Sequence, residues 1–361
     1  MNARRLGIAA VLAGAALALA GCERPPIDTV QRGYRGLAMG VVANPRTEAQ
    51  LLQANYVAPP SSPEPGSGAD GGPLASSIYT NVQVLKDLNV AQFSRLMVAM
   101  SEWVAPADQA CAYCHTPGEE LSSDSNYRKV VARQMLAMTR HINSSWKPHV
   151  AATGVTCYTC HRGNAVPKYT WTQAPAQDLG SNFAGNRDGQ NAPSMVVGLT
   201  SMPNDPFTTY LNEHATNIRV ISATALPAGS TRNIKQTEAS YGLMIHMSNA
   251  LGQNCTFCHN SRSFAEWNQS TPQRATAWHG IRMVRDLNEQ YLKPLTSVFP
   301  ANRKGPLGDV AKVNCETCHQ GAYKPLLGQS MLPDYPELAP AAPAATAAPA
   351  GPAAAAAPVA K

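Results

Sequence analysis

The sequence Cys-X-X-Cys-His occurs four times in this chain of 361 residues and uses eight of its nine cysteines. Each copy supplies two cysteines and a histidine: Cys111, Cys114 and His115; Cys157, Cys160 and His161; Cys255, Cys258 and His259; and Cys315, Cys318 and His319. Two thiols three residues apart lie on one turn of a helix, so both can form thioethers with one haem, while the histidine becomes an axial ligand of its iron. The motifs therefore predict four covalently bound haems c.

Three other uses of paired cysteines explain this pattern less well. A zinc site usually takes its four ligands from two such pairs, and a thioredoxin-like motif usually occurs once, near a βαβ pattern. Neither needs a histidine directly after every second cysteine. A disulfide within a motif would close a very short loop, and the stabilisation from a cross-link falls as the loop shortens. The position of the histidines therefore favours haem over a zinc or thioredoxin-like site, and the short loop argues against a disulfide.

The ninth cysteine, Cys22, follows a segment typical of exported bacterial lipoproteins. Arg4 and Arg5 precede an uncharged run rich in Leu and Ala at 6–20, which has the layout of a signal peptide and is short for a membrane span. The sequence Leu-Ala-Gly-Cys at 19–22 resembles a lipobox, whose cysteine is acylated and whose signal is removed. Because two or three acyl chains hold a protein stably on a bilayer, we expect Cys22 to anchor the chain to the periplasmic face of the cytoplasmic membrane. Ordinary signal cleavage with a spare thiol is the alternative.

The composition indicates an unusual core. Only 6% of the residues are aromatic and 14% are charged, so much of the core must come from something other than side chains, and haem faces can supply it. We predict a mainly α fold with extensive irregular loops, in which haems form much of the core. The formal charge of +6 includes two signal-peptide arginines and is offset by eight haem propionates. It is therefore no evidence for a nucleic-acid partner, and we expect none.

Changes in composition divide the chain into six segments. Pro, Gly and Ser are frequent at 59–73, and Ala and Pro dominate from 336, as in linkers and tails. The predicted segments are a signal peptide that is removed (1–21), an N-terminal anchor segment with a linker (22–81), a first two-haem segment (82–168), a connecting segment (169–227), a second two-haem segment (228–328) and a disordered Ala/Pro-rich tail (329–361).

An amphipathic helix followed by a motif recurs along the predicted core. Apolar residues spaced by three and four predict helices that begin after Asn89, at about 126, at about 237 and at Pro272. The apolar stripes of the last two helices include Tyr241 and Trp278. Because the order of helix, motif, helix and motif occurs twice, we expect a multihaem cytochrome c built as a duplicated two-haem unit.

Methionines on these helices are candidates for the second axial ligand of each iron. Three helices carry two methionines three residues apart: Met97 and Met100, Met135 and Met138, and Met244 and Met247. A methionine on an apolar helical face is more often a packing residue, and spacing alone does not choose within a pair. For the fourth haem the repeat nominates Met283 or His279, since both lie on the helix before Cys315.

Four stretches of the sequence resemble the tetrahaem cytochrome c subunit of purple-bacterial photosynthetic reaction centres. They are GVTCYTCHRG at 154–163, NCTFCHN at 254–260, SEWV at 101–104 and GIRMVRD at 280–286. The similarity covers almost all of the chain from 82 to 327, and GYRG at 33–36 also fits. The linker and the Ala/Pro-rich tail fall outside it.

The resemblance implies a sixth ligand for each haem by position. These are Met97 for the first haem, Met135 for the second, Met244 for the third and His149 for the fourth. His149 begins the sequence HVAATG and would reach across from the segment of the second motif, which departs from the repeat. No role follows for the remaining histidines, which we expect to be exposed or to pack: His141, His214, His246 and His279.

The resemblance also implies photosynthetic electron transfer and no enzyme activity. An iron whose two axial positions are filled by protein has no vacant site for a substrate and relays electrons. Members of the family dock on the reaction-centre core subunits and re-reduce the photo-oxidised bacteriochlorophyll special pair. A soluble periplasmic cytochrome c or high-potential iron-sulfur protein then reduces them again. The third haem, bound here through Cys255, Cys258 and His259, would lie nearest the special pair.

Two functions of other classes stay open on the sequence. A multihaem reductase would need an iron with an exchangeable axial position, which a high-spin haem or carbon monoxide binding to the native reduced protein would reveal. A quinol-oxidising anchor cytochrome would need a membrane helix to reach its quinol, and the cleavable signal argues against one.

Overall fold

The computed structural model describes residues 29–31, 40–42, 45–58, 72–175, 194–212, 218–220 and 233–339. The predicted signal peptide, Cys22, most of the linker and the chain after 339 lie outside these residues. The described chain is mostly helical with long irregular connections, as predicted, and has one short antiparallel strand pair in which Thr29 pairs with Val42. None of the described helices is both long enough and apolar enough to cross a membrane.

Short helices joined by loops make up most of the described chain. The strands are β1 (Thr29–Gln31) and β2 (Gly40–Val42). The α-helices are α2 (Pro45–Ala54), α3 (Ala75–Ile78), α4 (Val90–Val104), α5 (Tyr127–Ser145), α6 (Lys147–Val150), α7 (Cys157–His161), α8 (Pro206–Leu211), α9 (Ile234–Leu251), α10 (Pro272–Leu287) and α11 (Cys315–His319). The 3-10 segments are η1 (Ala110–Tyr113), η3 (Met195–Val197), η4 (Cys255–Phe257), η5 (Trp267–Gln269), η7 (Lys293–Ser297), η8 (Ala301–Arg303), η9 (Pro325–Gly328), η10 (Leu332–Asp334) and η11 (Pro336–Leu338), and a π-helical turn, η6 (Asn288–Leu292), continues α10.

The four predicted amphipathic helices are confirmed as α4, α5, α9 and α10. Side-chain oxygens of Asn89, Asn126 and Asn233 each accept a hydrogen bond from a backbone N–H in the first turn of α4, α5 and α9, which satisfies a donor that the helix itself cannot. Asn233 starts α9 three residues earlier than predicted, whereas α10 begins at Pro272 as expected.

Two residues that the sequence placed on apolar stripes are exposed, so that part of the prediction is wrong. Tyr241 on α9 is 53% exposed and Trp278 on α10 is 42% exposed. The Arg282 guanidinium lies 4.5 Å from the centre of the Trp278 ring and covers one face of the indole without burying it. The buried face of α10 is formed instead by residues such as Ile281 and Val284.

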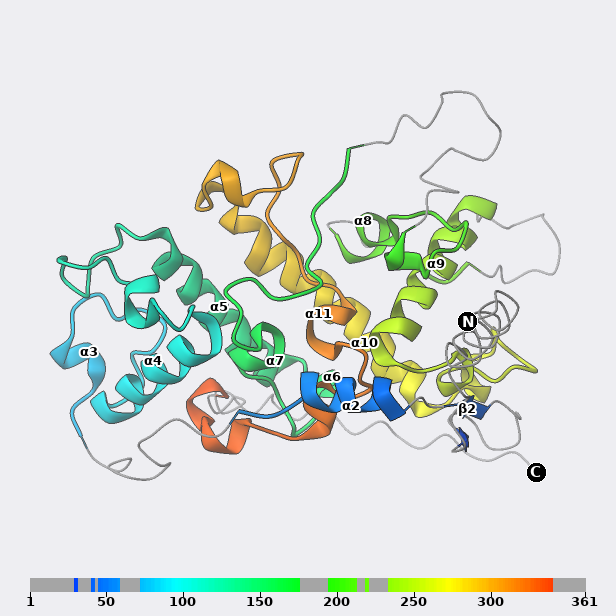
Figure 1. Ribbon diagram of the computed structural model, residues 1–361, viewed down its shortest axis with the longest axis horizontal. Coiled ribbons are helices and arrows are strands. Elements are labelled where there is room, and N and C mark those ends of the chain that lie inside the picture. The colour runs from blue at the N-terminus through cyan, green and yellow to red at the C-terminus, as the bar shows by residue number, and fades with distance from the viewer. Residues whose placement is uncertain are drawn as a thin grey trace, which may run out of the picture.

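The two pairs of motifs lie in halves that are built alike, the first from α4 to α7 and the second from α9 to α11. In Figure 1, α4 and α5 lie on one side of the molecule and α8 and α9 on the other. The first helix of each half packs on its second motif, α4 on α7 and α9 on α11. Gly163 N donates to Trp103 O at 2.9 Å, and Gly321 N donates to Ala250 O at 2.8 Å. Position 103 of α4 therefore corresponds to position 250 of α9.

Asn143 on α5 fixes the loop that leads into the second motif. Its Nδ2 donates to Val155 O at 2.8 Å, and its Oδ1 accepts from Val155 N at 2.8 Å. The same amide donates to Leu338 O at 2.8 Å. Asn143 is 4% exposed, so these hydrogen bonds satisfy polar atoms that water cannot reach.

Asn288 makes the same three hydrogen bonds in the second half, where α10 ends. Its Nδ2 donates to Val313 O at 3.0 Å and to Leu211 O at 2.7 Å. Its Oδ1 accepts from Val313 N at 2.9 Å. Val313 precedes Cys315 by two residues, as Val155 precedes Cys157, so both asparagines hold equivalent loops.

The arginines three residues earlier extend this correspondence. Arg140 Nε donates to Glu337 O at 3.0 Å, and Arg285 Nε donates to Tyr210 O at 3.1 Å. Each residue of α5 therefore corresponds to the residue 145 positions later, which lies in α10 or in its continuation η6.

Two segments receive these hydrogen bonds, and we call them the clasps: 206–211, which is α8, and 331–338. Each clasp follows one half in the sequence and packs on the other. The α8 clasp lies on α9 and α10, and the C-terminal clasp lies on α4 and α5. Figure 1 shows the C-terminal clasp in orange-red on the side of α4. The two halves are therefore joined by a reciprocal exchange of segments.

The C-terminal clasp corrects a predicted boundary. The sequence placed 329–361 in a disordered tail, but Met331, Tyr335 and Leu338 are 4%, 0% and 0% exposed. Tyr335 packs edge-on against Trp103, with ring centres 4.5 Å apart. Met331, Tyr335 and Leu338 are spaced by four and three, as on one face of a helix, but Pro333 and Pro336 interrupt so short a segment. The sequence therefore did not reveal their burial.

Helices α5 and α10 meet where the two halves join. Corresponding residues contact one another here, because His141 Nε2 lies 2.7 Å from Asp286 Oδ2, 145 positions later. Ile142 and Leu287, also corresponding residues, are 5% and 4% exposed in one apolar cluster. Contacts between equivalent residues are typical of an interface with approximate twofold symmetry.

We expect Asn143→Ala to lower the free energy of unfolding of the holoprotein by about 2–4 kcal/mol, because buried groups of Val155 and Leu338 lose their partners. The measurement is a guanidinium titration followed by circular dichroism. Asn268 is exposed, and the control Asn268→Ala should change the value by less than about 0.5 kcal/mol. Equal values for the two variants would contradict the role of Asn143.

Candidate functional site

The second and fourth motifs form one-turn helices, α7 and α11, that begin with the same cap. The backbone N–H before the first cysteine donates to a threonine hydroxyl three residues later. Thr156 N donates to Thr159 Oγ1 at 3.0 Å, and Asn314 N donates to Thr317 Oγ1 at 3.0 Å. This capping box holds both cysteines of a motif on one turn.

The first and third motifs lie on single 3-10 turns, η1 and η4. The residue that precedes the next helix binds the carbonyl just before the second cysteine. Asn126 Nδ2 donates to Tyr113 O at 3.1 Å, and Thr271 Oγ1 donates to Phe257 O at 2.6 Å. The starts of α5 and α10 therefore fix these two motifs.

Every motif histidine is held through its ring atom Nδ1. Each Nδ1 lies at hydrogen-bond distance from a backbone carbonyl three to six residues later: His115 from Leu121 O at 3.1 Å, His161 from Asn164 O at 2.8 Å, His259 from Phe264 O at 2.9 Å and His319 from Ala322 O at 3.0 Å. A ring that donates from Nδ1 presents the lone pair of Nε2. This is the arrangement of histidines that bind metals.

Burial favours the neutral form of these rings. Desolvation lowers the pKa of His115, His161 and His259 below the ordinary value of histidine, and lowers the pKa of His319 to about 4. Neutral imidazole is the form that binds a metal. The four rings are therefore in the protonation state of ligands at neutral pH.

The motif thiols differ from catalytic thiols. Burial raises the pKa of Cys157 and Cys258 to about 11 and that of Cys315 to about 12. Thioredoxin-like cysteines have a lowered pKa, so the geometry does not favour thiol redox chemistry. In the part of the chain that the structure describes, no three His, Cys, Asp or Glu side chains gather as ligands of one metal ion.

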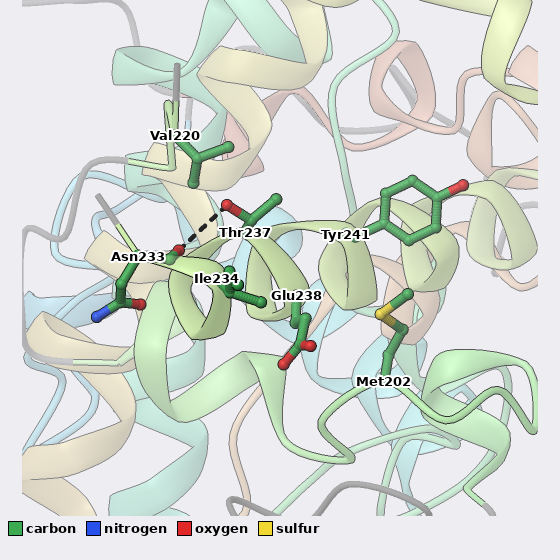
Figure 2. A pocket seen from close by; sticks show the side chains of 7 residues that line it. All are labelled: Met202, Val220, Asn233, Ile234, Thr237, Glu238 and Tyr241. Atoms are coloured by element: carbon green, nitrogen blue, oxygen red, sulfur yellow. Dashed lines mark hydrogen bonds between the residues drawn. The ribbon is translucent and has the colours of Figure 1, made fainter. Parts of the chain in front are cut away.

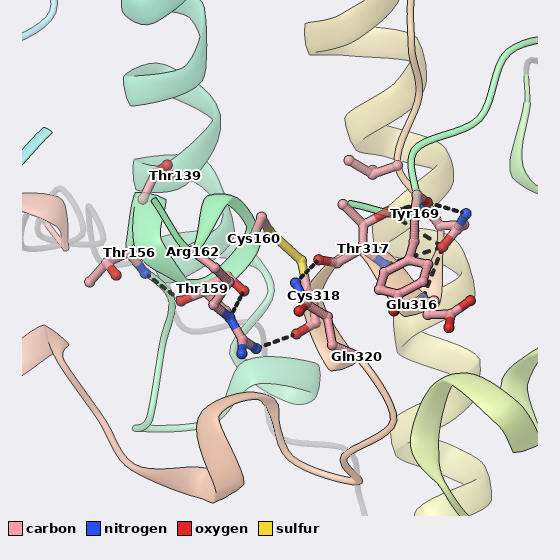
Figure 3. The surroundings of a disulfide bond; sticks show 12 residues. Thr139, Thr156, Thr159, Cys160, Arg162, Tyr169, Glu316, Thr317, Cys318 and Gln320 are labelled. Atoms are coloured by element: carbon pink, nitrogen blue, oxygen red, sulfur yellow. Dashed lines mark hydrogen bonds between the residues drawn. A yellow bond between two sulfur atoms is a disulfide. The ribbon is translucent and has the colours of Figure 1, made fainter. Parts of the chain in front are cut away.

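Cys160 and Cys318 form a disulfide in the structure, with Cα atoms 4.5 Å apart (Figure 3). The sequence predicted that each holds a haem, and one sulfur cannot belong to a disulfide and a thioether at once. The other six motif cysteines are free. The disulfide lies where α7 and α11 face each other, and Arg162 Nη2 also donates to Cys318 O at 3.2 Å. The second and fourth motifs are therefore side by side, although 158 residues separate these cysteines.

Packing distinguishes the candidates in two of the three methionine pairs. Met247 is 8% exposed in the apolar cluster of α8, α9 and α10, and Met138 packs against the cluster between the halves. Met244 packs against the same cluster as Met247 but is only partly buried. Met135 and Met138 are both partly buried, and of the two only Met138 packs against the cluster between the halves. Met97 and Met100 both pack, partly buried, against the core of the first half, so their own contacts do not choose between them.

His149 lies on α6, beside α10 and the fourth motif. Its ring centre is 6.0 Å from that of His319, with the ring planes 69° apart. Its Nδ1 lies 2.9 Å from Thr276 O, so Nε2 is again the nitrogen available to a metal. Met283 is 8% exposed in the cluster between the halves, and the His279 ring packs against Trp278. Of these three candidates, the structure brings His149 into ring contact with the histidine of the fourth motif.

Of two further histidines, His246 has a packing role, as expected, whereas His141 binds a carboxylate. His246 is 1% exposed and packs edge-on against Phe207, and burial lowers its pKa to about 4. His141 pairs with Asp286, whose Oδ2 also accepts a hydrogen bond from Trp146 Nε1 at 2.9 Å. His214 lies outside the described residues.

An open pocket of about 410 Å³ lies at the start of α9 (Figure 2). In its wall, Thr237 Oγ1 donates to Asn233 O at 3.2 Å. The lining residues are Met202, Val220, Asn233, Ile234, Thr237, Glu238 and Tyr241. They include no motif residue and no candidate ligand, so this pocket is separate from the four motifs.

Sequence reasoning missed the caps of α7 and α11 and the two bridging asparagines. The caps had a signal, because Thr156 and Asn314 are each followed by a threonine three residues later. Asn143 and Asn288 had no such signal, because a single buried asparagine does not belong to a periodic pattern. Only comparison of the two halves at the correct spacing could have found them.

Comparison with known proteins gives one consistent result. Residues 23–339 match the family described as the photosynthetic reaction centre cytochrome c subunit. The chain is 56% identical over 338 residues to the photosynthetic reaction center cytochrome c subunit of Rubrivivax gelatinosus, covering 93% of this chain and 90% of that protein. The corresponding subunit of Thermochromatium tepidum is 49% identical over 336 residues, covering 93% and 81%. That of Roseobacter denitrificans is 38% identical over 354 residues, covering 92% of each chain.

Proposed function

Because the chain belongs to the family of photosynthetic reaction centre cytochrome c subunits, we propose that it holds four haems c and delivers electrons to the photo-oxidised bacteriochlorophyll special pair. Membership alone makes it an electron-transfer component of a membrane-associated reaction centre, with covalently bound haem c, and not a classical enzyme. A bound haem c would supply a one-electron couple between ferrous and ferric iron.

The proposed arrangement is a duplicated two-haem unit. Its support is the set of equivalent contacts in the two halves: the backbone hydrogen bonds of Gly163 and Gly321, the bridges of Asn143 and Asn288, and the capping boxes of α7 and α11. Each half would hold two haems through two cysteine pairs. All eight motif cysteines would then be thioethers, so the loaded protein could not contain the disulfide between Cys160 and Cys318.

The observation that carries the proposal is the pair of imidazoles at the fourth motif. A bond from a metal to an imidazole nitrogen is about 2 Å long, so two imidazoles on opposite sides of one iron have ring centres about 6 Å apart. The ring centres of His149 and His319 are 6.0 Å apart. Both rings engage Nδ1 with a backbone carbonyl. This geometry supports His319 as the proximal ligand and His149 as the sixth ligand of the fourth iron.

Met97, Met135 and Met244 would hold the first three irons together with His115, His161 and His259. Met247 is a buried member of the core of the second half, whereas Met244 packs against that core and is only partly buried, which favours Met244 as the ligand from α9. Positions 103 and 250 correspond at a spacing of 147, and the residue 147 positions before Met244 is Met97. We therefore propose Met97 as the ligand from α4. On α5, Met138 packs against the cluster between the halves. Met135 is therefore the proposed ligand of the second iron.

Complete coordination supports electron transfer over catalysis. With two protein ligands on every iron, no axial position remains for a substrate, as a multihaem reductase would need. Methionine raises the potential of a haem relative to histidine. On ligand type alone, the fourth haem, with His149 and His319, is the least oxidising of the four.

The proposed partners follow from family membership. The core subunits of the reaction centre would receive electrons from the third haem, held through Cys255, Cys258 and His259. A soluble cytochrome c or high-potential iron-sulfur protein would reduce this cytochrome again. Acylated Cys22 would anchor it to the periplasmic face of the membrane.

We expect the mature protein to carry Cys160 and Cys318 as thioethers, which thiol reductants do not cleave. After denaturation, reduction and alkylation, mass spectrometry should find both residues in haem-bearing peptides. Haem-free protein is the control and should be alkylated at every motif cysteine. Alkylated Cys160 and Cys318 in the mature protein would contradict haem attachment by two thioethers at the second and fourth motifs.

Cys22→Ser should release the cytochrome into the soluble fraction of cells that lack the core subunits, because the variant cannot be acylated at this position. Haem staining of membrane and soluble fractions measures the change. The unmodified protein in the same cells should sediment with the membranes. Sedimentation of the variant with membranes would argue against the acyl anchor.

A flash of light on native membranes should oxidise this cytochrome, because the oxidised special pair withdraws an electron from it. The measurement is the rapid bleaching of its c-haem absorbance. Membranes stripped of the cytochrome are the control, and their special pair should stay oxidised for longer. A cytochrome that remains reduced while the special pair is oxidised would exclude the proposed role.

A further inference from the structure

Helix α10 lacks a methionine where α5 carries Met135. The paired arginines and asparagines set a spacing of 145 positions, which makes Gly280 the counterpart of Met135. Burial agrees with this spacing, because the next residues, Leu136 and Ile281, are 4% and 6% exposed. The second half therefore has no side chain at the position that the first half is proposed to use for a ligand.

The His149 ring occupies the space where a side chain of residue 280 would begin. A Cβ built on Gly280 would lie 2.6 Å from His149 Cε1, 2.9 Å from Nδ1 and 3.2 Å from Nε2. Real Cβ atoms do not approach other atoms this closely, and a packed ring yields little. Gly280 lies inside α10, whose backbone any residue other than proline can adopt. The ring, and not the backbone, requires glycine here.

Thr276 fixes the rotation of the same ring. It lies four residues before Gly280 and so on the same face of α10. Its carbonyl lies 2.9 Å from His149 Nδ1, which donates to it. The bare backbone at 280 and the carbonyl of Thr276 together seat the ring on α10, with the His319 ring centre 6.0 Å away.

We propose that Gly280 is a positioning residue that decides the ligand type of the fourth haem. Having no side chain at the position equivalent to Met135, it admits His149 from the first half. The fourth iron then receives a histidine where the repeat would supply a methionine. This inference rests on the proposed ligation of that iron by His149 and His319. Because histidine lowers the potential relative to methionine, one missing side chain lowers the potential of one haem.

The first test is Gly280→Ala in the full-length holoprotein. The added methyl group should displace His149 and open an axial position, so one haem per molecule becomes high-spin and binds carbon monoxide when reduced. Electron paramagnetic resonance and carbon monoxide titration measure this, with all four haems still attached. The control is His279→Ala, which changes the neighbouring residue of α10 without entering the space of the ring. It should bind no carbon monoxide.

The second test exchanges the ligand. In Gly280→Met combined with His149→Ala, the methionine on α10 should bind the fourth iron as Met135 is proposed to bind the second. This variant should bind no carbon monoxide, and a redox titration should give one midpoint potential above the corresponding value of the unmodified protein. His149→Ala alone should bind about one carbon monoxide per molecule. A double variant that behaves like His149→Ala would contradict the equivalence of positions 135 and 280.

The outcomes separate this inference from the proposed function. If His149→Ala leaves the low-spin signals unchanged and binds no carbon monoxide, the proposed ligation itself fails. If His149→Ala opens an axial position and Gly280→Ala does not, the ligation stands and the role of Gly280 is overturned. If the Gly280→Ala protein does not accumulate in cells, the double variant Gly280→Ala with His149→Ala tests whether the clash with the His149 ring is the cause. Recovery of a protein with four haems locates the clash at the ring, and failure to recover overturns the proposal.

Discussion

Each proposed histidine ligand depends on one hydrogen bond that fixes its imidazole through Nδ1. The four motif histidines and His149 all hold Nδ1 against a backbone carbonyl, which reserves Nε2 for a metal. Carbonyls in short loops can do this only if the loops themselves are held. The loops that carry the carbonyls of Asn164 and Ala322 are held by hydrogen bonds from Gly163 to α4 and from Gly321 to α9. The starts of α5 and α10 fix the first and third motifs. The scaffold thus serves to keep a few carbonyls in place.

The halves complete each other through the exchanged clasps. Asn143 joins α5, the loop before the second motif and the C-terminal clasp, and Asn288 joins the equivalent parts of the second half through α8. Because each clasp follows the opposite half in the sequence, neither half closes its core with its own following segment. The exchange, together with the contact of α5 and α10, holds the two pairs of motifs in a fixed relative position.

The local parts of this structure could be predicted from the sequence, and the long-range parts could not. The five residues of a motif are contiguous in the sequence, and a cap such as Asn89 marks the start of a helix within one turn, so these predictions needed no knowledge of the fold. The contact between Cys160 and Cys318 and the burial of Tyr335 depend on segments more than a hundred residues away. The contact between the cysteines has no periodic signal. The apolar residues around Tyr335 are few and interrupted by prolines, which suggested a tail.

The fourth ligand shows where reasoning from a repeat stops. A duplicated unit predicts that equivalent positions have equivalent roles, and the capping boxes, arginines and asparagines follow that rule. Position 280 breaks it, because the space beside Gly280 contains a ring from the other half. Spacing within one half cannot reveal a group that enters from outside it. Four identical sites would also share one ligand set. A single glycine that admits His149 would give one haem a different ligand and so a different potential.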